Sequence, residues 1–169
     1  MLKRSKSLAC ALSFLVCFGA LGAMMPAHAQ RIELAHNLAS DARAAAQQGK
    51  PLFLFVTQPG CPFCDRARRE YLRHLAVDPA YTRRLLFREL SIEGNVTGFD
   101  DKRSTGLAAA RALKIKLYPT IVIVDGTGEA VAAPLVGFTV PDFYAAQIDG
   151  RIEEAELHLA ARIKPGSTN

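Results

Sequence analysis

The chain has 169 residues, of which 50% are hydrophobic and 22% are charged. This composition is ordinary for a globular protein, and the length suits one domain with a hydrophobic core better than two. The formal net charge is +5, but three of the positive charges lie in the first 29 residues and the rest of the chain carries +2. The charge therefore gives no support for a nucleic-acid-binding function.

Residues 1–29 have the pattern of a secretory signal peptide. Three basic residues precede an uncharged apolar stretch that ends at Pro26, and Ala27-His28-Ala29 follows as a small-x-small cleavage site. An uncleaved membrane anchor is the alternative, because the apolar stretch is close to the shortest length that spans a bilayer. We expect cleavage, which leaves residues 30–169 as one mature domain in the periplasm.

The first half of the mature chain alternates helical and strand patterns. A five-residue run that is entirely apolar is too short for a surface helix and predicts a central buried strand. The predicted elements are a helix over 30–48 with Leu34, Leu38, Ala42 and Ala45 on one face, a strand over 52–56, a turn over 57–60, a helix over 61–77, a short helix over 78–84 and a strand over 85–92.

The second half begins with a polar stretch, 93–103, for which a loop is predicted. The predicted elements that follow are a helix over 106–113 capped by Ser104 or Thr105, a strand over 121–124, a hairpin turn over 125–128 and a partner strand over 129–136. A terminal helix over 141–163, bent at Asp149-Gly150, and a frayed tail over 164–169 complete the prediction. The early strand-helix-strand unit implies parallel pairing and the hairpin antiparallel pairing. We therefore predict an α/β fold with a mixed sheet and helices on both faces.

Cys61-Pro62-Phe63-Cys64 lies where the second predicted helix begins. Two cysteines at this spacing are within disulfide reach, and the first lies near the unpaired N–H groups of the helix, which favour a thiolate. Cys10 and Cys17 leave with the signal peptide, so the mature chain keeps this one pair. In an oxidising compartment the pair is either a structural bridge or a redox couple. The short spacing favours the redox couple, because so small a loop constrains the unfolded chain little.

A metal site is the other use of such a motif. Structural zinc takes about four ligands, and the mature chain has no second cysteine pair. His36, His74 and His158 show no ligand spacing, and Asp65 stands where haem attachment would require a histidine. We therefore predict neither a metal nor another cofactor, with a metal-binding or chaperone module as the alternative.

The order of elements and the places of the motifs resemble the thioredoxin fold. Cys61-Pro62-Phe63-Cys64 follows the central strand and opens a helix, and Tyr118-Pro119-Thr120 precedes the hairpin as the cis-proline loop of thioredoxin-like proteins does. Gly137 lies near the end of the last strand, where many relatives carry glycine. The resemblance covers roughly 32–163 and, within the superfamily, is greatest to exported single-domain thioredoxins, including the SoxW type.

The resemblance implies roles for the residues of the two motifs. Cys61 is the expected nucleophile, which attacks a substrate disulfide, and Cys64 is expected to resolve the mixed disulfide that results. The side chains and backbone expected to contact the substrate are those of Pro62, Phe63, Tyr118 and Pro119.

The chain departs from the thioredoxin pattern at one buried position. Thioredoxins carry an aspartate six residues before the first cysteine, where this chain has Phe55. The proton acceptor for Cys64 is therefore not identified by the resemblance. The arginines of the helix that carries Cys64 are expected to form a solvated face: Arg66, Arg68, Arg69 and Arg73.

The resemblance implies a periplasmic thiol:disulfide oxidoreductase that acts as a protein-disulfide reductase. Its expected partners are exported disulfide-containing proteins and a membrane thiol reductase of the DsbD type, and a monomer is expected. The alternative enzyme is a DsbA-like oxidant. About 54 residues separate Cys64 from Pro119, which leaves no room for the large helical insertion of DsbA.

Overall fold

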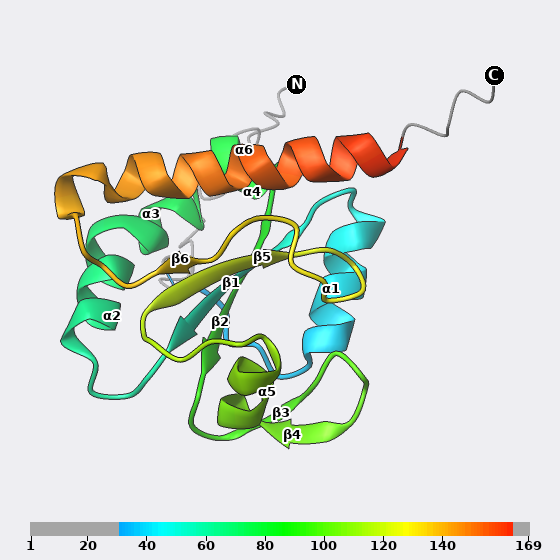
Figure 1. The fold of residues 1–169 in the computed structure, drawn as a ribbon, viewed down its shortest axis with the longest axis horizontal. Coiled ribbons are helices and arrows are strands. Elements are labelled where there is room, and N and C mark those ends of the chain that lie inside the picture. The colour runs from blue at the N-terminus through cyan, green and yellow to red at the C-terminus, as the bar shows by residue number, and fades with distance from the viewer. Residues whose placement is uncertain (1–30, 164–169) are drawn as a thin grey trace, which may run out of the picture.

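A four-stranded sheet lies at the centre of the computed structural model, which describes residues 31–163 (Figure 1). The elements in chain order are α1 (Leu38–Gln47), β1 (Leu52–Thr57), α2 (Pro62–Ala67), the π-helical turn η2 (Arg68–Leu72), α3 (Arg73–Leu75), α4 (Pro79–Thr82), β2 (Leu86–Ser91), β3 (Asn95–Thr97), β4 (Arg103–Thr105), α5 (Gly106–Ala112), β5 (Thr120–Val124), β6 (Leu135–Val136), the 3-10 turn η3 (Pro141–Phe143) and α6 (Tyr144–Ile163). The expected signal peptide, 1–29, and the tail, 164–169, lie outside the described residues, so the cleavage site and the domain boundary stay predictions. None of the helices within 31–163 is long and apolar enough to cross a bilayer.

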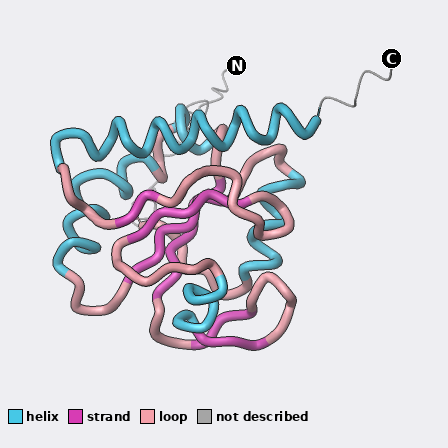
Figure 2. Tube along the Cα trace, in the orientation of Figure 1, coloured by secondary structure: helices cyan, strands magenta, loops and turns pink. Residues whose placement is uncertain are grey.

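The sheet is mixed, as predicted. Its strand order is β2-β1-β5-β6, with β1 and β2 parallel and the other two pairings antiparallel. Every residue of β1 and β5 is buried, because helices cover both faces (Figure 2). The chain thus has the predicted α/β architecture.

Alternate residues of β1 contribute to two separate hydrophobic clusters. Phe53 and Phe55 pack with residues of α2, η2 and α6, whereas Leu52, Leu54 and Val56 pack with residues of α1 and α5. This alternation follows from the two-residue period of a strand. We call the first side of the sheet the cysteine face, because Cys64 belongs to its cluster, and the second the aliphatic face.

Helix α1 begins at Leu38, so the prediction of a helix from residue 30 is wrong at its start. The side chain of Asn37 caps the helix by accepting a hydrogen bond of 2.9 Å from the N–H of Ser40. The predicted buried positions within the helix are confirmed for Leu38, Ala42 and Ala45.

The residues before α1 run extended beside β2. The N–H of Ala35 donates to the carbonyl of Glu89, and the N–H of Glu89 donates to the carbonyl of Glu33, each at 2.8 Å. Leu34, predicted on the buried face of a helix, is 52% exposed. The backbone groups on the free side of β2 thereby obtain partners, which an exposed strand edge would lack.

The stretch 93–103 is not a plain loop, contrary to the prediction. Asn95–Thr97 and Arg103–Thr105 pair as a small antiparallel sheet. Thr105 then caps α5, as predicted, because its hydroxyl accepts a hydrogen bond of 3.2 Å from the N–H of Ala108.

The strand predicted over 129–136 is reduced to a bridge at Ala130 and the two residues of β6. The turn before it is confirmed by a hydrogen bond of 3.0 Å from the N–H of Gly128 to the carbonyl of Asp125. Helix α6 continues without interruption through Gly150, where a bend was predicted, and lies across the cysteine face of the sheet (Figure 1).

Candidate functional site

Cys61 and Cys64 are joined by a disulfide bond at the start of α2, with their Cα atoms 5.3 Å apart. Cys61 is the N-cap residue, and its sulfur accepts a hydrogen bond of 3.1 Å from the N–H of Cys64. Pro62 is the first helical residue, where its missing N–H leaves nothing unpaired. Cys64 is buried, whereas Cys61 is partly exposed. Cys61 is therefore the more accessible of the two cysteines.

The turn before the cysteines brings the chain from the sheet to the helix. Strand β1 ends at Thr57, and Gly60 adopts a φ of 69°, in the left-handed region that favours glycine. The buried strand thus delivers Cys61 to the sheet edge formed by the carboxyl ends of β1 and β2.

The loop before β5 contains a cis peptide bond between Tyr118 and Pro119, as the resemblance implied. Pro119 is buried, and its carbonyl accepts a hydrogen bond of 2.7 Å from the N–H of Gly137. Tyr118 is half-buried and packs against the cluster that contains Cys64, as Cys61 also does. The structure thus gathers the two predicted motifs around one cluster.

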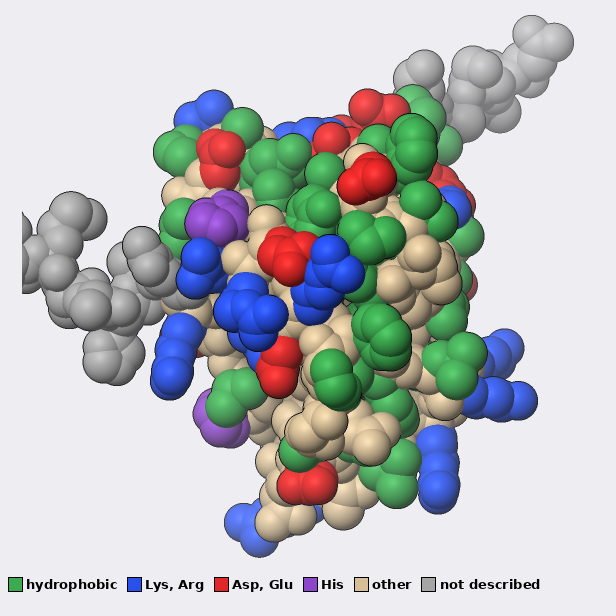
Figure 3. All heavy atoms as spheres, turned by 90° about the vertical axis from the view of Figure 1, so that its left-hand side faces the viewer, with side chains coloured by type: hydrophobic (Ala, Val, Ile, Leu, Met, Phe, Trp, Pro, Cys, Tyr) green, Lys and Arg blue, Asp and Glu red, His purple; other side chains and the backbone are tan. Residues whose placement is uncertain are grey.

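Several large hydrophobic side chains remain exposed on elements next to these motifs. Phe63 is 59% exposed beside the cysteines, and Leu117 is 64% exposed just before the cis bond. Val136 of β6 is also exposed and is the register partner of Thr120. Figure 3 shows hydrophobic side chains spread among the charged ones on the molecular face at the left of Figure 1. Leu117 and Val136 were missed in the sequence, because exposure depends on the folded surface.

A buried ion pair on the cysteine face was also missed. Glu89 of β2 is 7% exposed, and its carboxylate accepts a hydrogen bond of 2.9 Å from the hydroxyl of Thr57. Arg68 donates two hydrogen bonds to the same carboxylate, from Nη2 at 2.5 Å and from Nε at 3.0 Å. Its Nη1 donates a third, of 2.6 Å, to the carboxylate of Asp65. We call Thr57, Asp65, Arg68 and Glu89 the Arg68 network.

The network corrects the prediction of a solvated arginine face at one position. The side chain of Arg68 is only 31% exposed. Its hydrogen bond with Glu89 raises the pKa of the Arg68 guanidinium above its ordinary value, although burial acts in the opposite direction. Arg68 is therefore a partly buried cation held in place by the carboxylates of Glu89 and Asp65. The clue in the sequence was Glu89 itself, because it stands two residues after Phe87 on the buried side of its strand.

The Arg68 network lies on the same side of the sheet as Cys64. Glu89 is the register partner of Phe55, whose side chain belongs to the cluster of Cys64, and the guanidinium of Arg68 lies 5.7 Å from the Phe55 ring centre. The N–H of Arg68 donates to the carbonyl of Cys64, so the two residues are one helical turn apart. Side chains at this spacing are neighbours, with about 5–6 Å between Cβ atoms.

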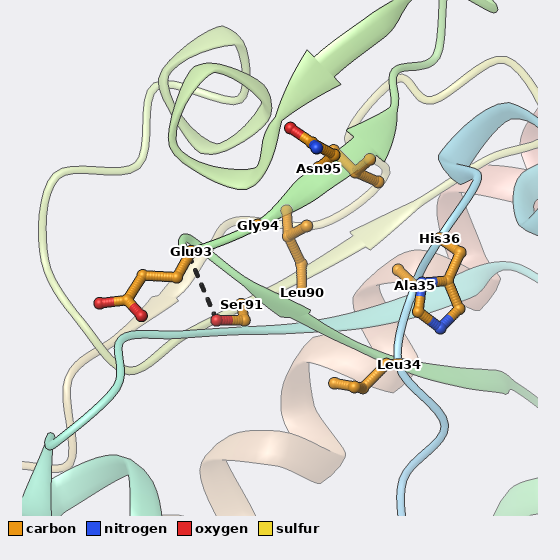
Figure 4. A pocket seen from close by; sticks show the side chains of 9 residues that line it. Leu34, Ala35, His36, Leu90, Ser91, Glu93, Gly94 and Asn95 are labelled. Carbon is orange, nitrogen blue, oxygen red and sulfur yellow. Dashed lines mark hydrogen bonds between the residues drawn. The ribbon is translucent and has the colours of Figure 1, made fainter.

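A shallow hollow of about 240 Å³ lies elsewhere, between residues 34–36 and the connection from β2 to β3 (Figure 4). Its polar lining includes His36, Ser91 and Glu93, with the N–H of Glu93 donating to the Ser91 hydroxyl at 3.3 Å. None of the predicted site residues lines this hollow.

Comparison with known proteins agrees with this architecture. A family model described as a thioredoxin-like domain matches residues 38–150. Among similar solved structures are the oxidoreductase DsbH (TM-score 0.52, 18% identity, 81% of this chain and 95% of that one), a Malassezia sympodialis thioredoxin (0.51, 15%, 73% and 92%) and thioredoxin f from spinach chloroplast in its short form (0.50, 19%, 74% and 96%). At such identities the likeness shows the fold alone. No curated protein matches the chain.

Proposed function

Because the chain belongs to the thioredoxin-like family, we propose that it is a thiol:disulfide oxidoreductase that reduces disulfide bonds of exported proteins in the periplasm. The observation that carries the proposal is the Cys61–Cys64 disulfide at a helix start, with one sulfur partly exposed and the other buried. The signal-peptide pattern of residues 1–29 supports the location. The narrower resemblance to SoxW-type proteins stays a prediction.

In the proposed reaction, the two thiols of the reduced protein reduce a substrate disulfide and become the Cys61–Cys64 disulfide. The thiolate of Cys61 attacks one substrate sulfur, forms a mixed disulfide and releases the other substrate sulfur as a thiolate. Cys64 then loses its proton and attacks the sulfur of Cys61. The Cys61–Cys64 bond forms, the second substrate thiolate leaves, and two electrons have passed to the substrate.

The difference in exposure supports this division of roles. An attacking sulfur must reach a second protein, and Cys61 is the partly exposed one. A resolving sulfur needs to reach only its neighbour, and Cys64 is 1% exposed. The hydrogen bond from the N–H of Cys64 to the sulfur of Cys61 also favours a thiolate at Cys61.

The substrate is proposed to lie as an extended segment along the loop of Tyr118 and Pro119. Pro119 has no N–H, and the backbone of Tyr118 would pair with the segment in the manner of an added strand. Pro62 and the exposed ring of Phe63 would contact the residues that flank the substrate disulfide. Leu117, exposed just before the cis bond, is proposed to contact the same segment.

The reductase direction requires an electron donor in an oxidising compartment. We propose a membrane dithiol donor of the DsbD type, which would reduce the Cys61–Cys64 disulfide by the same exchange in reverse. The protein is proposed to act as a monomer.

The experiment that tests the function is the reduction of insulin disulfides by the purified protein, with dithiothreitol as the donor. Cys61→Ser is expected to lower the rate to the uncatalysed level, because it removes the attacking sulfur. His36→Asn is a matched control at a side chain that lines the separate hollow. Catalysis retained by Cys61→Ser would contradict the proposal. Stoichiometric zinc or copper in the purified protein, without reductase activity, would favour the metal-binding alternative.

A further inference from the structure

We propose that Glu89 and Arg68 set the ionisation of the cysteine thiols, with Glu89 lowering the reduction potential of the pair and Arg68 raising it. The inference rests on the proposed function, since it concerns the same two sulfurs. Glu89 is a buried carboxylate on β2. Its register partner on β1 is Phe55, which occupies the position where thioredoxins carry their aspartate.

Glu89 is the most buried of the ion-paired carboxylates in residues 31–163, closely followed by Asp125 at 10% side-chain exposure. The Glu89 side chain is 9% exposed, compared with 42% for Glu156 in the two-bond pair with Arg84. A buried ion pair is weak evidence for stability, because desolvation of the two charges offsets much of their attraction. Burial does leave the field of such charges poorly screened by salt and water. A fixed charge in this position is suited to act on a neighbouring titrating group.

Cys64 is a titrating group on the same face of the sheet. Arg68 follows Cys64 by one helical turn and bridges to Glu89. Both charges lie beside Phe55, whose ring packs in the cluster of Cys64. The thiol therefore loses or gains its proton on the side of the sheet that holds one buried anion and one partly buried cation.

Other charged and titratable groups lie on the elements that surround the cysteine pair. They are Asp65, Arg66, Arg69, Glu70 and Tyr71 on the helix, Lys116 and Tyr118 on the cis-proline loop, and Asp142 and Tyr144 on the segment that leads into α6. The charged members of this set are all more exposed than Arg68 and Glu89. Their fields are accordingly screened more strongly than those of the buried pair.

The signs of the two effects follow from Coulomb's law. A negative charge disfavours a nearby thiolate and a positive charge favours it. Stabilising the thiolate stabilises the reduced protein and makes the pair a stronger oxidant. Loss of the Glu89 charge should therefore raise the reduction potential, and loss of the Arg68 charge should lower it. A purely structural pair has no reason to give shifts of opposite sign.

The experiment is equilibration of the purified protein with glutathione buffers, for the wild type, Glu89→Gln, Arg68→Gln and the double variant. Glu89→Gln is expected to shift the equilibrium about tenfold toward the reduced protein, which corresponds to about 30 mV. Arg68→Gln is expected to shift it in the opposite direction. The double variant should return to within about threefold of the wild type, because the net charge is restored, and Arg68→Lys should keep the wild-type value.

Arg84→Gln and Glu156→Gln are the matched controls. They break the ion pair of two hydrogen bonds between Arg84 and Glu156 and should leave the equilibrium unchanged. Arg84 precedes the start of β2, whereas Cys61 follows the end of the parallel strand β1. The pH dependence of Cys61 alkylation is the second measurement, and Glu89→Gln should move it to lower pH.

Reduction potentials that shift in the same direction in both variants, or by no more than in the controls, would overturn the inference. Insulin reduction by the wild type would still support the proposed function. A wild type without a measurable redox couple would overturn both. If Arg68→Gln does not fold, as judged by circular dichroism, Glu89→Gln and the double variant decide the question, because their potentials must differ.

Discussion

The two faces of the central sheet are built from alternate residues of the same strands, yet they differ in chemistry. Every buried member of the aliphatic cluster is Ala, Val, Leu or Ile. The cysteine face instead combines aromatic rings with Cys64, and the Arg68 network lies at its margin. One face thus supplies burial alone, while the other holds sulfur and charge on the same side of the sheet.

The largest expected effect is on the cysteine face, at the resolving sulfur. Reduced Cys64→Ser, freed of dithiothreitol before it meets the substrate, should leave Cys61 joined to the substrate, because the protein has no resolving thiol at position 64 to release it. Mass spectrometry of the reaction with a disulfide-containing protein should detect the mixed disulfide. Complete release of the substrate by Cys64→Ser under these conditions, with no mixed disulfide detected, would contradict the assignment of Cys64 as the resolving residue.

On the aliphatic face, Leu54→Ala should change stability and not redox chemistry. Leu54 is fully buried in β1, and truncation of such a side chain costs about 2–5 kcal/mol of unfolding free energy. Urea denaturation measures this loss, and equilibration with glutathione measures the potential. A changed potential in the folded variant would show that the two faces are coupled.

A buried carboxylate far from the cysteines tests whether burial of charge is enough to affect them. Burial alone would raise the pKa of Asp125, but hydrogen bonds from Thr127, Glu129 and Arg162 hold it below its ordinary value of 3.8. Asp125 follows Val124, which pairs with the start of β1, so it lies at the sheet edge opposite Cys61.

Asp125→Asn should therefore lower the unfolding free energy at pH 7 by about 1–2 kcal/mol, as expected for lost charge-assisted hydrogen bonds. Since the folded-state pKa is depressed, this contribution is fully present above pH 3.8 and is lost as the pH falls through the lower folded value. Thermal melts of both proteins across this range measure the difference, which should close at low pH. If Asp125→Asn shifted the reduction potential as much as Glu89→Gln, the location of a buried carboxylate relative to the cysteines would not matter.

The smallest expected effect is at the exposed rim of the cysteine face. Phe63 is 59% exposed, so Phe63→Ser should leave stability nearly unchanged. It should raise the KM for a protein substrate roughly fivefold, the equivalent of about 1 kcal/mol of lost apolar contact. Steady-state kinetics with insulin measure the change, and Leu157→Ser on the exposed side of α6 is the control. An unchanged KM would remove Phe63 from the proposed substrate surface.

Local patterns predicted the elements that carry the candidate site. The apolar run of β1, the two cysteines at a helix start and the run of β5 each contain their own signal, and all three were confirmed. The extended segment before α1 could not be predicted in this way. Its hydrogen bonds go to Glu89, more than fifty residues away, and no local pattern reports them.

The sequence by itself determined the helices and strands that carry the site and the position of the cysteine pair, because each depends on residues close together in the chain, and the cis-proline loop followed from the resemblance to thioredoxins. Only the tertiary structure decided the surroundings of Cys64. Arg68 stands among arginines that a helical pattern assigns to solvent, and it turns inward because a carboxylate on β2 lies within hydrogen-bond distance. A buried charge requires a partner of opposite sign, and which residue provides it depends on how the helix and the strand pack together.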